Sequence, residues 1–551
     1  MADGEHYTTL ENNDIRRYAY ATASEGVSLL PSPAPNLAIS DYAFSPDERM
    51  ILIASGRTPI YRHSYTTQYH LLADGRIRPV LQEAEAPRDA SFSPDGRKIA
   101  YSDRNDLYVW DIATGKTQRI TDDGAWNAVI NGTTDWVYEE EFGTTRAYAF
   151  SPDGGQLAFL RFDESEVPLM EMMRFDGKLY NQAYSFKYPK AGERNSVVQL
   201  WIADLETGAK ERIDTGGETD QYIPRIGWTP DGRPWYYRLN RRQNTFEMIV
   251  CEPHGAQRTV YDERAQQYVE RVDDGTVTFV DRDRFLVRQE SHTGFMHLYL
   301  YSLRRGILEQ VTKGPWEVTQ VVGTDGKRVW FLSTETSPLR RNLYSVRLDG
   351  KDKQRLTTGE GYYTAAPSAG MKYFITTFSN ASTPNVTEVC DAAGKPVRTL
   401  ADSRRLREEQ GLVYSVDACA SSYLSAGVFA VSMGVSRESE KKAVLTAAEV
   451  LREFPDTVTE EELDLARDHY LSGLIMSLES NSARAARYGT GELLLGGAIS
   501  EKELEEKIRG VSIDEIRSLA RSFSSLSDAC ICAVGRTAGA KFYNKVVSGK
   551  K

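Results

Sequence analysis

One sequence pattern recurs from the start of the chain to about residue 400. Each copy has a Ser-Pro-Asp-Gly turn, an apolar segment, a second segment rich in Tyr, Trp and Leu, an Asp-x-x-Thr-Gly turn and a closing segment. In these turns Gly supplies positive φ and Pro presets the first turn angle, while the segments between them alternate as strands do. The clearest copies begin at Phe44, Phe92, Phe150, Val198, Trp228, His297 and Asn342.

This pattern predicts a β-propeller. Short antiparallel strands that return roughly every 45 to 75 residues are typical of propeller blades. We expect about eight blades, with residues 4–25 forming the first. A β-sandwich, the competing all-β fold, would not reuse one set of turns so many times.

The pattern changes near residue 402 to helices mixed with strands. Thr459, Ser500 and Ser512 are each followed three positions later by Glu, which is the spacing of a capping box. Residues 423–435 and 529–535 resemble strands, the second of them a closing strand. One helical stripe is expected at Leu463, Ala466, Tyr470 and Leu474. The prediction is therefore a mainly β chain in which a propeller at 1–402 precedes a truncated α+β domain at 403–551.

Composition excludes several classes of protein. A net charge of −11 argues against nucleic-acid binding, which needs clustered Lys and Arg. No run of about 18 apolar residues suggests a membrane span. The first ten residues are polar, so no signal peptide is expected there. The five scattered cysteines predict no disulfide framework, and Cys530 and Cys532 are expected to be small core residues of the closing strand.

Catalytic motifs are missing from the sequence. A serine hydrolase of the α/β type needs G-x-S-x-G, and the segments at Gly434 and Gly510 lack its second glycine. None of the seven histidines has the H-E-x-x-H or H-x-x-E-H surroundings of a zinc hydrolase. No phosphate loop or G-x-G-x-x-G occurs. We therefore expect no catalytic residue, no metal site and no cofactor.

The clearest chemical signal is the segment DWVYEEEF at residues 135–142. Three consecutive glutamates ordinarily mark a solvated face. Here Trp136, Tyr138 and Phe142 flank them, and acids beside aromatic rings can hold an ammonium ion. More than one carboxylate suits a primary ammonium group, which has three N–H donors.

The chain resembles the dipeptidyl peptidase IV family over about residues 1–402. The resemblance rests on DWVYEEEF, on IYRHSYTTQYHLL from Ile60, which is similar to the family's arginine strand, and on the long segment from Phe162. It implies an eight-bladed propeller that caps a serine hydrolase. It also implies that Glu140 and Glu141 bind the amino terminus of a peptide and that Arg62 binds a peptide carbonyl. Without that context, Arg62 is an ordinary surface arginine.

From residue 403 the chain resembles part of the C-terminal domain of pitrilysin/insulysin-type zinc peptidases, the half without the metal. The segments SRRLREEQGLVYSVDA, SLESNSAR and ACICAVG carry this resemblance. It implies that Arg407 and Tyr414 are the pair that contacts substrate near the zinc of the other half. In isolation they are a helix-end arginine and a strand tyrosine. The first strand and helix of that domain are not found, which predicts an unpaired sheet edge.

Three functions stay open at this point. The chain is a module that binds peptides with a free amino terminus, an enzyme whose hydrolase comes from a partner chain, or a scaffold or non-catalytic subunit that pairs with an active zinc-peptidase half. The junction near residue 402 also suggests a chimeric reading frame. Family members are typically periplasmic, secreted or membrane-anchored, and many are bacterial, but the compartment of this chain stays unknown.

Overall fold

The computed structural model describes most of the 551 residues. The residues that it does not describe are 12, 23–25, 32–36, 175–178, 253–254, 271, 382, 403–414, 423–426, 436, 438, 461, 465, 469, 472–484, 486–487, 490, 494–496, 498–499, 528 and 549–551. The chain divides into two compact units, Met1–Asp402 and Ser403–Lys551, and each is described by itself.

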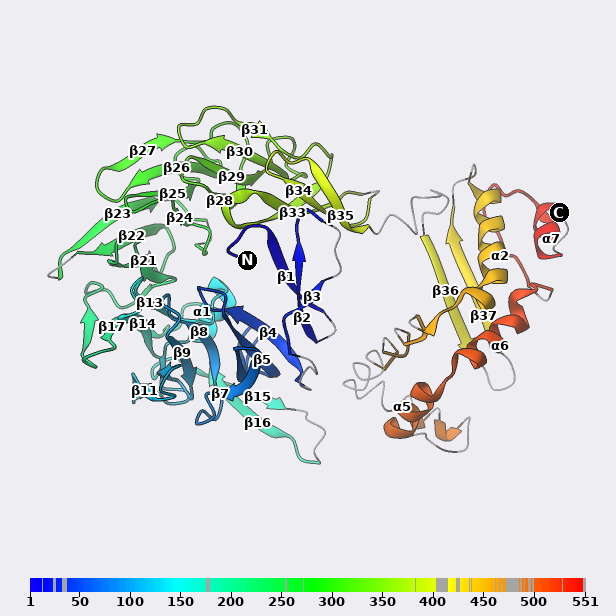
Figure 1. Cartoon of the computed structure of the whole chain (residues 1–551), viewed down its shortest axis with the longest axis horizontal. Coiled ribbons are helices and arrows are strands. Elements are labelled where there is room, and N and C mark those ends of the chain that lie inside the picture. The colour runs from blue at the N-terminus through cyan, green and yellow to red at the C-terminus, as the bar shows by residue number, and fades with distance from the viewer. Residues whose placement is uncertain are drawn as a thin grey trace. The chain divides into compact units, whose positions relative to one another are not determined.

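The first unit is an eight-bladed β-propeller built from consecutive antiparallel sheets (Figure 1). The first four blades are formed by β1 (His6–Glu11), β2 (Asp14–Ala19) and β3 (Val27–Ser28); by β4 (Ile39–Phe44), β5 (Met50–Pro59), β6 (Tyr65–Ala73) and β7 (Arg76–Val80); by β8 (Arg88–Phe92), β9 (Lys98–Asp103), β10 (Asp106–Asp111) and β11 (Thr117–Arg119); and by β12 (Val129–Asn131), β13 (Tyr148–Phe150), β14 (Gln156–Asp163), β17 (Val197–Asp204) and β18 (Lys210–Ile213).

The other four blades follow in chain order. They are formed by β19 (Gln221–Tyr222), β20 (Ile226–Trp228), β21 (Pro234–Asn240), β22 (Thr245–Cys251) and β23 (Gln257–Arg264); by β24 (Val277–Phe279), β25 (Arg284–Gln289), β26 (His297–Ser302) and β27 (Gly306–Gln310); by β28 (Val318–Thr324), β29 (Arg328–Ser333), β30 (Asn342–Arg347) and β31 (Gln354–Arg355); and by β32 (Tyr362–Pro367), β33 (Tyr373–Ser379), β34 (Val386–Asp391) and β35 (Pro396–Asp402), with the 3₁₀ turn η2 (Ala369–Met371) between β32 and β33. The predicted propeller is confirmed.

The recurring turn explains why each blade folds alike. In the third blade the Ser93 hydroxyl donates to Asp95 at 2.5 Å and accepts the Lys98 N–H at 2.9 Å. Gly96 completes the turn with φ +70°, a conformation that glycine adopts without strain. Ser45 with Asp47 and Ser151 with Asp153 repeat the bond between hydroxyl and carboxylate. The predicted turns therefore set the register of the paired strands.

The ring closes through side chains that join the first blade to the eighth. Arg398 on β35 donates from Nη2 to the Ala19 carbonyl at 2.7 Å and from Nε to the Tyr20 carbonyl at 3.1 Å. The ring of Tyr20 stacks on that of Tyr373, with 5.4 Å between centroids. In Figure 1 the first strands accordingly lie beside β33 and β35.

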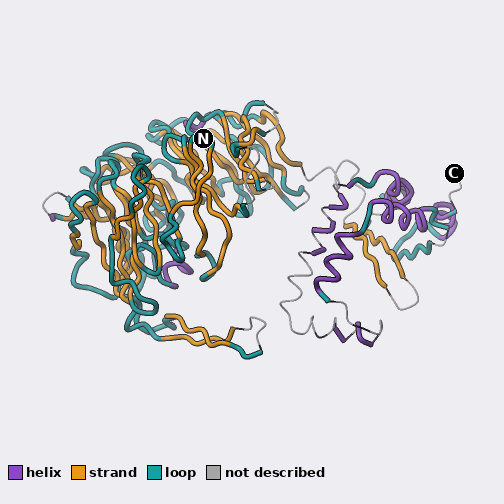
Figure 2. Tube along the Cα trace, turned by 60° about the horizontal axis from the view of Figure 1, so that its bottom comes forward, coloured by secondary structure: helices purple, strands orange, loops and turns teal. Residues whose placement is uncertain are grey.

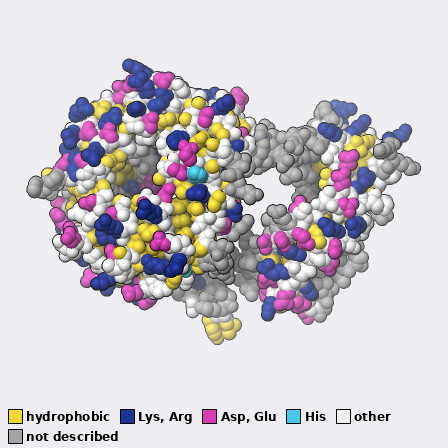
Figure 3. All heavy atoms as spheres, viewed as in Figure 1, with side chains coloured by type: hydrophobic (Ala, Val, Ile, Leu, Met, Phe, Trp, Pro, Cys, Tyr) yellow, Lys and Arg dark blue, Asp and Glu magenta, His cyan; other side chains and the backbone are white. Residues whose placement is uncertain are grey.

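A two-stranded arm extends from the fourth blade between β14 and β17. Its strands, β15 (Leu169–Arg174) and β16 (Gln182–Lys187), pair antiparallel and project from the body of the propeller (Figure 2). Charged side chains of both signs are mixed over the face of the propeller that Figure 3 presents, without a single basic patch. No helix among the described residues is long and apolar enough to cross a membrane.

The second unit contains a hairpin and several helices. Its elements are β36 (Ser415–Ser422), β37 (Gly427–Gly434), α2 (Glu440–Thr457), α5 (Glu501–Gly510), α6 (Ile513–Ser524) and α7 (Ala540–Val547). The capping predictions are confirmed: the Thr459 and Ser512 backbone N–H groups donate to Glu462 and Glu515, and the Ser500 hydroxyl accepts the Glu503 N–H. Phe429 on β37 stacks on Phe523 of α6 at 5.0 Å.

Two predictions for this unit are wrong. Residues 529–534 form no strand, and Cys530 and Cys532 are exposed rather than packed in a core. A strand forms only where a neighbour satisfies its backbone groups, and among the described residues the sheet of this unit has only β36 and β37. The predicted stripe is also wrong in part. Leu463 is buried, but Ala466 is exposed and Tyr470 is 58% exposed, and Leu474 lies outside the described residues.

Candidate functional site: an acidic helix against an arginine loop

The segment DWVYEEEF folds as a short helix, α1 (Trp136–Phe142), between β12 and β13 of the fourth blade. Asp135 begins the helix by accepting the Tyr138 N–H at 2.9 Å, and its other oxygen accepts the Ser196 hydroxyl at 2.6 Å. Gly143 ends the helix with φ +63°. Burial raises the pKa of Asp135, and the bonds from Ser196 and the helix amides oppose that rise.

Apolar packing fixes the orientation of α1. Val137, Tyr138 and Phe142 are buried in the largest core cluster of the propeller, which spans the fourth to sixth blades. The Tyr138 hydroxyl also accepts the Ile223 N–H at 2.7 Å. Because this packing and this hydrogen bond fix one side of α1, the three glutamates lie on a rigid helix.

The three glutamates have different surroundings. Glu139 is 1% exposed, Glu140 is partly buried, and Glu141 is exposed. The expectation that a run of glutamates forms a solvated face is therefore wrong for Glu139, because each residue of a helix points about 100° away from the last. One short segment thus supplies a buried acid, a half-buried acid and a free one.

Arg62 lies opposite α1 on the loop between β5 and β6 of the second blade. Its Nε–H donates to Oε2 of Glu140 at 3.0 Å, and its Nη2 lies 2.9 Å from Oε1. The pair is bidentate, but the Arg62 side chain is 70% exposed and that of Glu140 25%, so it contributes only about 0.5 kcal/mol to folding. The expectation that Arg62 lies on a strand is wrong, since β5 ends at Pro59 and β6 begins at Tyr65.

Glu139 joins the helix to that loop. Its Oε1 accepts the His63 N–H at 2.7 Å and the Ser64 N–H at 2.9 Å. Sequence analysis missed this role, although Asp135 and Gly143 bracket the segment with ordinary helix-capping signals. Recognising the helix would have shown that the three glutamates could not share one environment.

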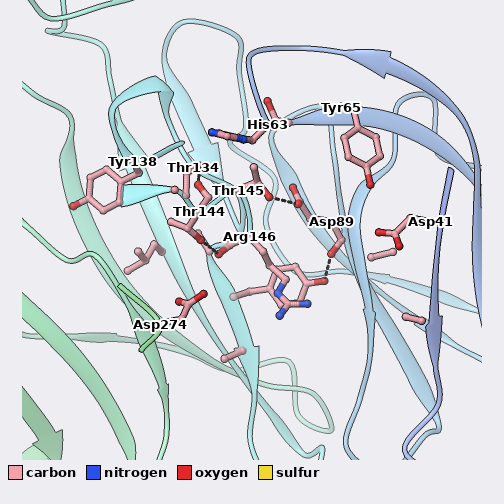
Figure 4. A pocket seen from close by; sticks show the side chains of 18 of the residues that line it. Asp41, His63, Tyr65, Asp89, Thr134, Tyr138, Thr144, Thr145, Arg146 and Asp274 are labelled. Carbon is pink, nitrogen blue, oxygen red and sulfur yellow. Dashed lines mark hydrogen bonds between the residues drawn. The ribbon is translucent and has the colours of Figure 1, made fainter. Parts of the chain in front are cut away.

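A cavity of about 520 Å³ lies beside the loop, and His63 and Ser64 of the loop are among the residues that line it (Figure 4). Its walls come from several blades and include Asp41, His63, Tyr65, Asp89, Tyr138, Arg146 and Asp274. Asp89 accepts the Thr145 hydroxyl at 2.6 Å and so joins two of these walls. No group of three or more His, Cys, Asp or Glu suited to a metal ion occurs among the described residues.

The structure thus brings together Arg62 and Glu140, with Glu141 next to them on the helix. Arg407 and Tyr414, the other two predicted site residues, lie outside the described residues. The class defined by this fold and site is an eight-bladed propeller that presents an acidic helix and an arginine loop beside a cavity lined by several blades.

Comparison with known proteins identifies the family. Residues 45–385, more than half of the chain, match the family described as "Dipeptidyl peptidase IV (DPP IV) N-terminal region", and residues 403–470 match "Peptidase M16 inactive domain". The chain therefore belongs to the dipeptidyl peptidase IV family.

Individual relatives agree. "Dipeptidyl peptidase 4" of Trichophyton rubrum is 32% identical over 400 residues, which are 67% of this chain and 50% of that protein. "Probable dipeptidyl peptidase 4" of Aspergillus flavus is 30% identical over 438 residues, 74% of this chain and 56% of that protein. This chain thus spans about half the length of these curated relatives.

Solved structures support the fold. Dipeptidyl peptidase 4 of Porphyromonas gingivalis has a TM-score of 0.71 at 33% identity, covering 79% of this chain and 63% of that one. A putative dipeptidyl aminopeptidase IV of Bacteroides ovatus has a TM-score of 0.57 at 18% identity, covering 78% of this chain and 63% of that one.

Proposed function

We propose that the propeller binds the free amino terminus of a peptide. Glu141 and Glu140 are the anionic partners of its ammonium group, and Arg62 is the partner of a peptide carbonyl. The observation that carries this proposal is the exposed carboxylate of Glu141 beside the bidentate pair of Arg62 and Glu140. Peptides that begin Xaa-Pro or Xaa-Ala are the class that family membership favours.

The chemistry of the three side chains suits this ligand. A primary ammonium has three N–H donors, and Arg62 already engages both oxygens of Glu140. Glu141 is then the main partner of the incoming charge, and the remaining lone pairs of Glu140 share it. Arg62 directs further N–H groups outward, where a carbonyl oxygen can accept them.

In this proposal, the chain by itself binds the peptide but does not cleave it. Its residues include no G-x-S-x-G and no zinc-ligand pair of histidines. A second candidate function follows from the match of residues 403–470 to "Peptidase M16 inactive domain". In that case the chain is a non-catalytic subunit or scaffold that pairs with an active zinc-peptidase half, and Arg407 and Tyr414 contact its substrate.

Titration calorimetry of a Gly-Pro peptide into the Glu141→Ala variant tests the binding proposal. Because the Glu141 carboxylate is exposed, loss of its contact with the ammonium group corresponds to about 1 kcal/mol, or roughly fivefold weaker binding. Glu309→Ala, which removes an exposed acid from β27 of another blade, should bind like the wild type. Equal affinities for all three proteins would refute the proposal.

Hydrolysis of a Gly-Pro chromogenic substrate by the purified chain separates the alternatives. No turnover is expected from a binding module. Turnover blocked by a chelator would support a recruited zinc-peptidase half, and turnover blocked by a serine-directed reagent would refute binding without cleavage.

A further inference from the structure

Few hydrogen bonds hold the loop that carries Arg62 in place. Within it the Ile60 N–H donates to the Ser64 carbonyl at 2.9 Å, and the Tyr61 N–H donates to the Ser64 hydroxyl at 3.3 Å. From outside, Oε1 of Glu139 accepts the two consecutive amides of His63 and Ser64. The amide next to Arg62 is therefore fixed by a side chain that lies on the same helix as Glu140.

Burial of the Glu139 carboxylate has to be offset by hydrogen bonds or by a nearby cation. A carboxylate that is 1% exposed is strongly destabilising unless hydrogen bonds or a cation offset its desolvation. Arg88 on β8 supplies that cation. Its side chain is buried, with the residue only 8% exposed. Burial lowers the pKa of Arg88, and the charges of Asp89, Glu139 and Tyr61 oppose that shift.

The backbone around Arg88 is irregular, and this irregularity affects the direction of its side chain. A register shift lies between Arg88 and Ser91, where β8 has one residue more than its partner β9. Asp89 within the shift has φ +56°, which is uncommon for a residue with a side chain. Bulges of this kind re-aim side chains and often lie beside functional sites. The Arg88 side chain forms no hydrogen bond with Glu139, so the interaction between the two residues is one of charge.

We propose that Glu139 is a positioning residue for the amino-terminus site, with Arg88 as its buried countercharge. This inference rests on the proposed function. Glu139 holds the His63 and Ser64 amides, which fixes Arg62 at the distance where it meets Glu140 and leaves Glu141 free for the ligand. The first glutamate of the three thus shapes the site without touching the peptide.

Two measurements on the full chain test this role. One is the initial rate of tryptic cleavage after Arg62, with cleavage after the exposed Arg305 as the internal reference. The other is the affinity for a free-amino Gly-Pro peptide. Glu139→Gln keeps an acceptor oxygen but lacks the negative charge, and Glu139→Ala lacks both. Glu309→Gln is the control for the loss of a surface acid.

We expect Glu139→Gln to cleave several times faster after Arg62 and to bind the peptide about five- to tenfold more weakly, as for one weakened charge-assisted bond. Glu139→Ala should be cleaved still faster after Arg62 and should bind the peptide still more weakly. If that variant does not fold, Arg88→Met replaces it, with faster cleavage and weaker binding again expected. Cleavage after Arg305 should not change.

Three results would overturn the proposal. They are an unchanged Arg62 cleavage rate, unchanged peptide affinity in folded Glu139→Gln, or equal acceleration of cleavage at Arg62 and Arg305. If the wild type itself binds free and amino-blocked peptides equally, the proposed function fails and this inference fails with it. Failure of the proposed function can be told apart from failure of this inference alone, because it is measured on the wild type before any variant is made.

Discussion

Arg62 and Glu140, which are 78 positions apart in the sequence, meet in a bidentate ion pair across two blades of the propeller. The pair occupies the Glu140 carboxylate, which is one of the two proposed partners of a peptide amino terminus. In that proposal, an incoming ammonium group joins an existing network of charges rather than an empty acidic site.

Replacing Arg62 by Met should separate stability from binding. Because the pair is largely exposed, its loss should change the free energy of unfolding by no more than about 1 kcal/mol. Affinity for a free-amino Gly-Pro peptide should nevertheless fall about tenfold, since Arg62 is the proposed partner of the peptide carbonyl. Urea unfolding and calorimetry measure the two effects, with Arg305→Met as the matched control. A large loss of stability without a loss of affinity would contradict this role.

Asp135 should stabilise the propeller through its helix-capping hydrogen bond. Asp135→Ala removes the acceptor of the Tyr138 N–H and leaves the Ser196 hydroxyl without its partner, so we expect a loss of about 1–2 kcal/mol. Asp135→Asn keeps an oxygen at the cap and should lose less than half as much. Urea unfolding of the two variants checks the order, and equal losses would show that the charge matters rather than the bond.

Glu164 should make the stability of the propeller depend on pH. Burial raises its pKa from 4.5 to about 7, with Asp135 and Asp163 acting in the same direction and Lys187 opposing them. The folded state therefore holds a proton that the unfolded state releases between about pH 4.5 and 7, and stability falls as pH rises through that window. The loss is at most about 3.4 kcal/mol, since one pKa unit corresponds to 1.36 kcal/mol.

The measurement is the free energy of unfolding of wild type and Glu164→Gln from pH 4.5 to 8.5. The variant should gain stability relative to the wild type as pH rises and reach a constant difference above about pH 8. The exposed neighbour Glu166, replaced by Gln, should show no such gain. A difference that is the same at every pH would show that Glu164 is ionised throughout.

Arg398 should hold the ring closed. Its guanidinium donates to the Ala19 and Tyr20 carbonyls of the first blade, and no other described side chain donates to either carbonyl. We expect Arg398→Met to destabilise the propeller by about 1–3 kcal/mol and to increase amide exchange in β1 and β2. Uniform exchange across all blades would contradict a local role in closure.

Much of the propeller could be predicted because its signals are local. The Ser93–Asp95–Gly96 turn is readable in the sequence, and the structure forms it with the expected bonds. The difference in burial between Glu139 and Glu141 could not be predicted without recognising α1, because the helix is what points the three consecutive glutamates in different directions. The strand expected at 529–535 failed for a non-local reason, because pairing depends on a neighbour that the segment itself does not specify.

The position of Arg62 shows the same limit. Its segment predicted a strand, but Arg62 lies on a loop. The His63 and Ser64 amides of that loop donate to Glu139, which is 77 positions further along the chain than Arg62. Arg88 could not be found from its own segment either, since a bulge in β8 turns it inward. Local patterns thus predicted the blades, whereas contacts between blades determine the site.

The most direct test is calorimetric titration of the wild-type chain with two forms of one peptide, Gly-Pro-Ala with a free amino terminus and the same peptide acetylated at that end. Acetylation removes the ammonium charge and leaves the carbonyls in place. If Glu141 and Glu140 hold the amino terminus, the free peptide should bind at least tenfold more tightly than the acetylated one. Equal affinities would contradict recognition of the amino terminus.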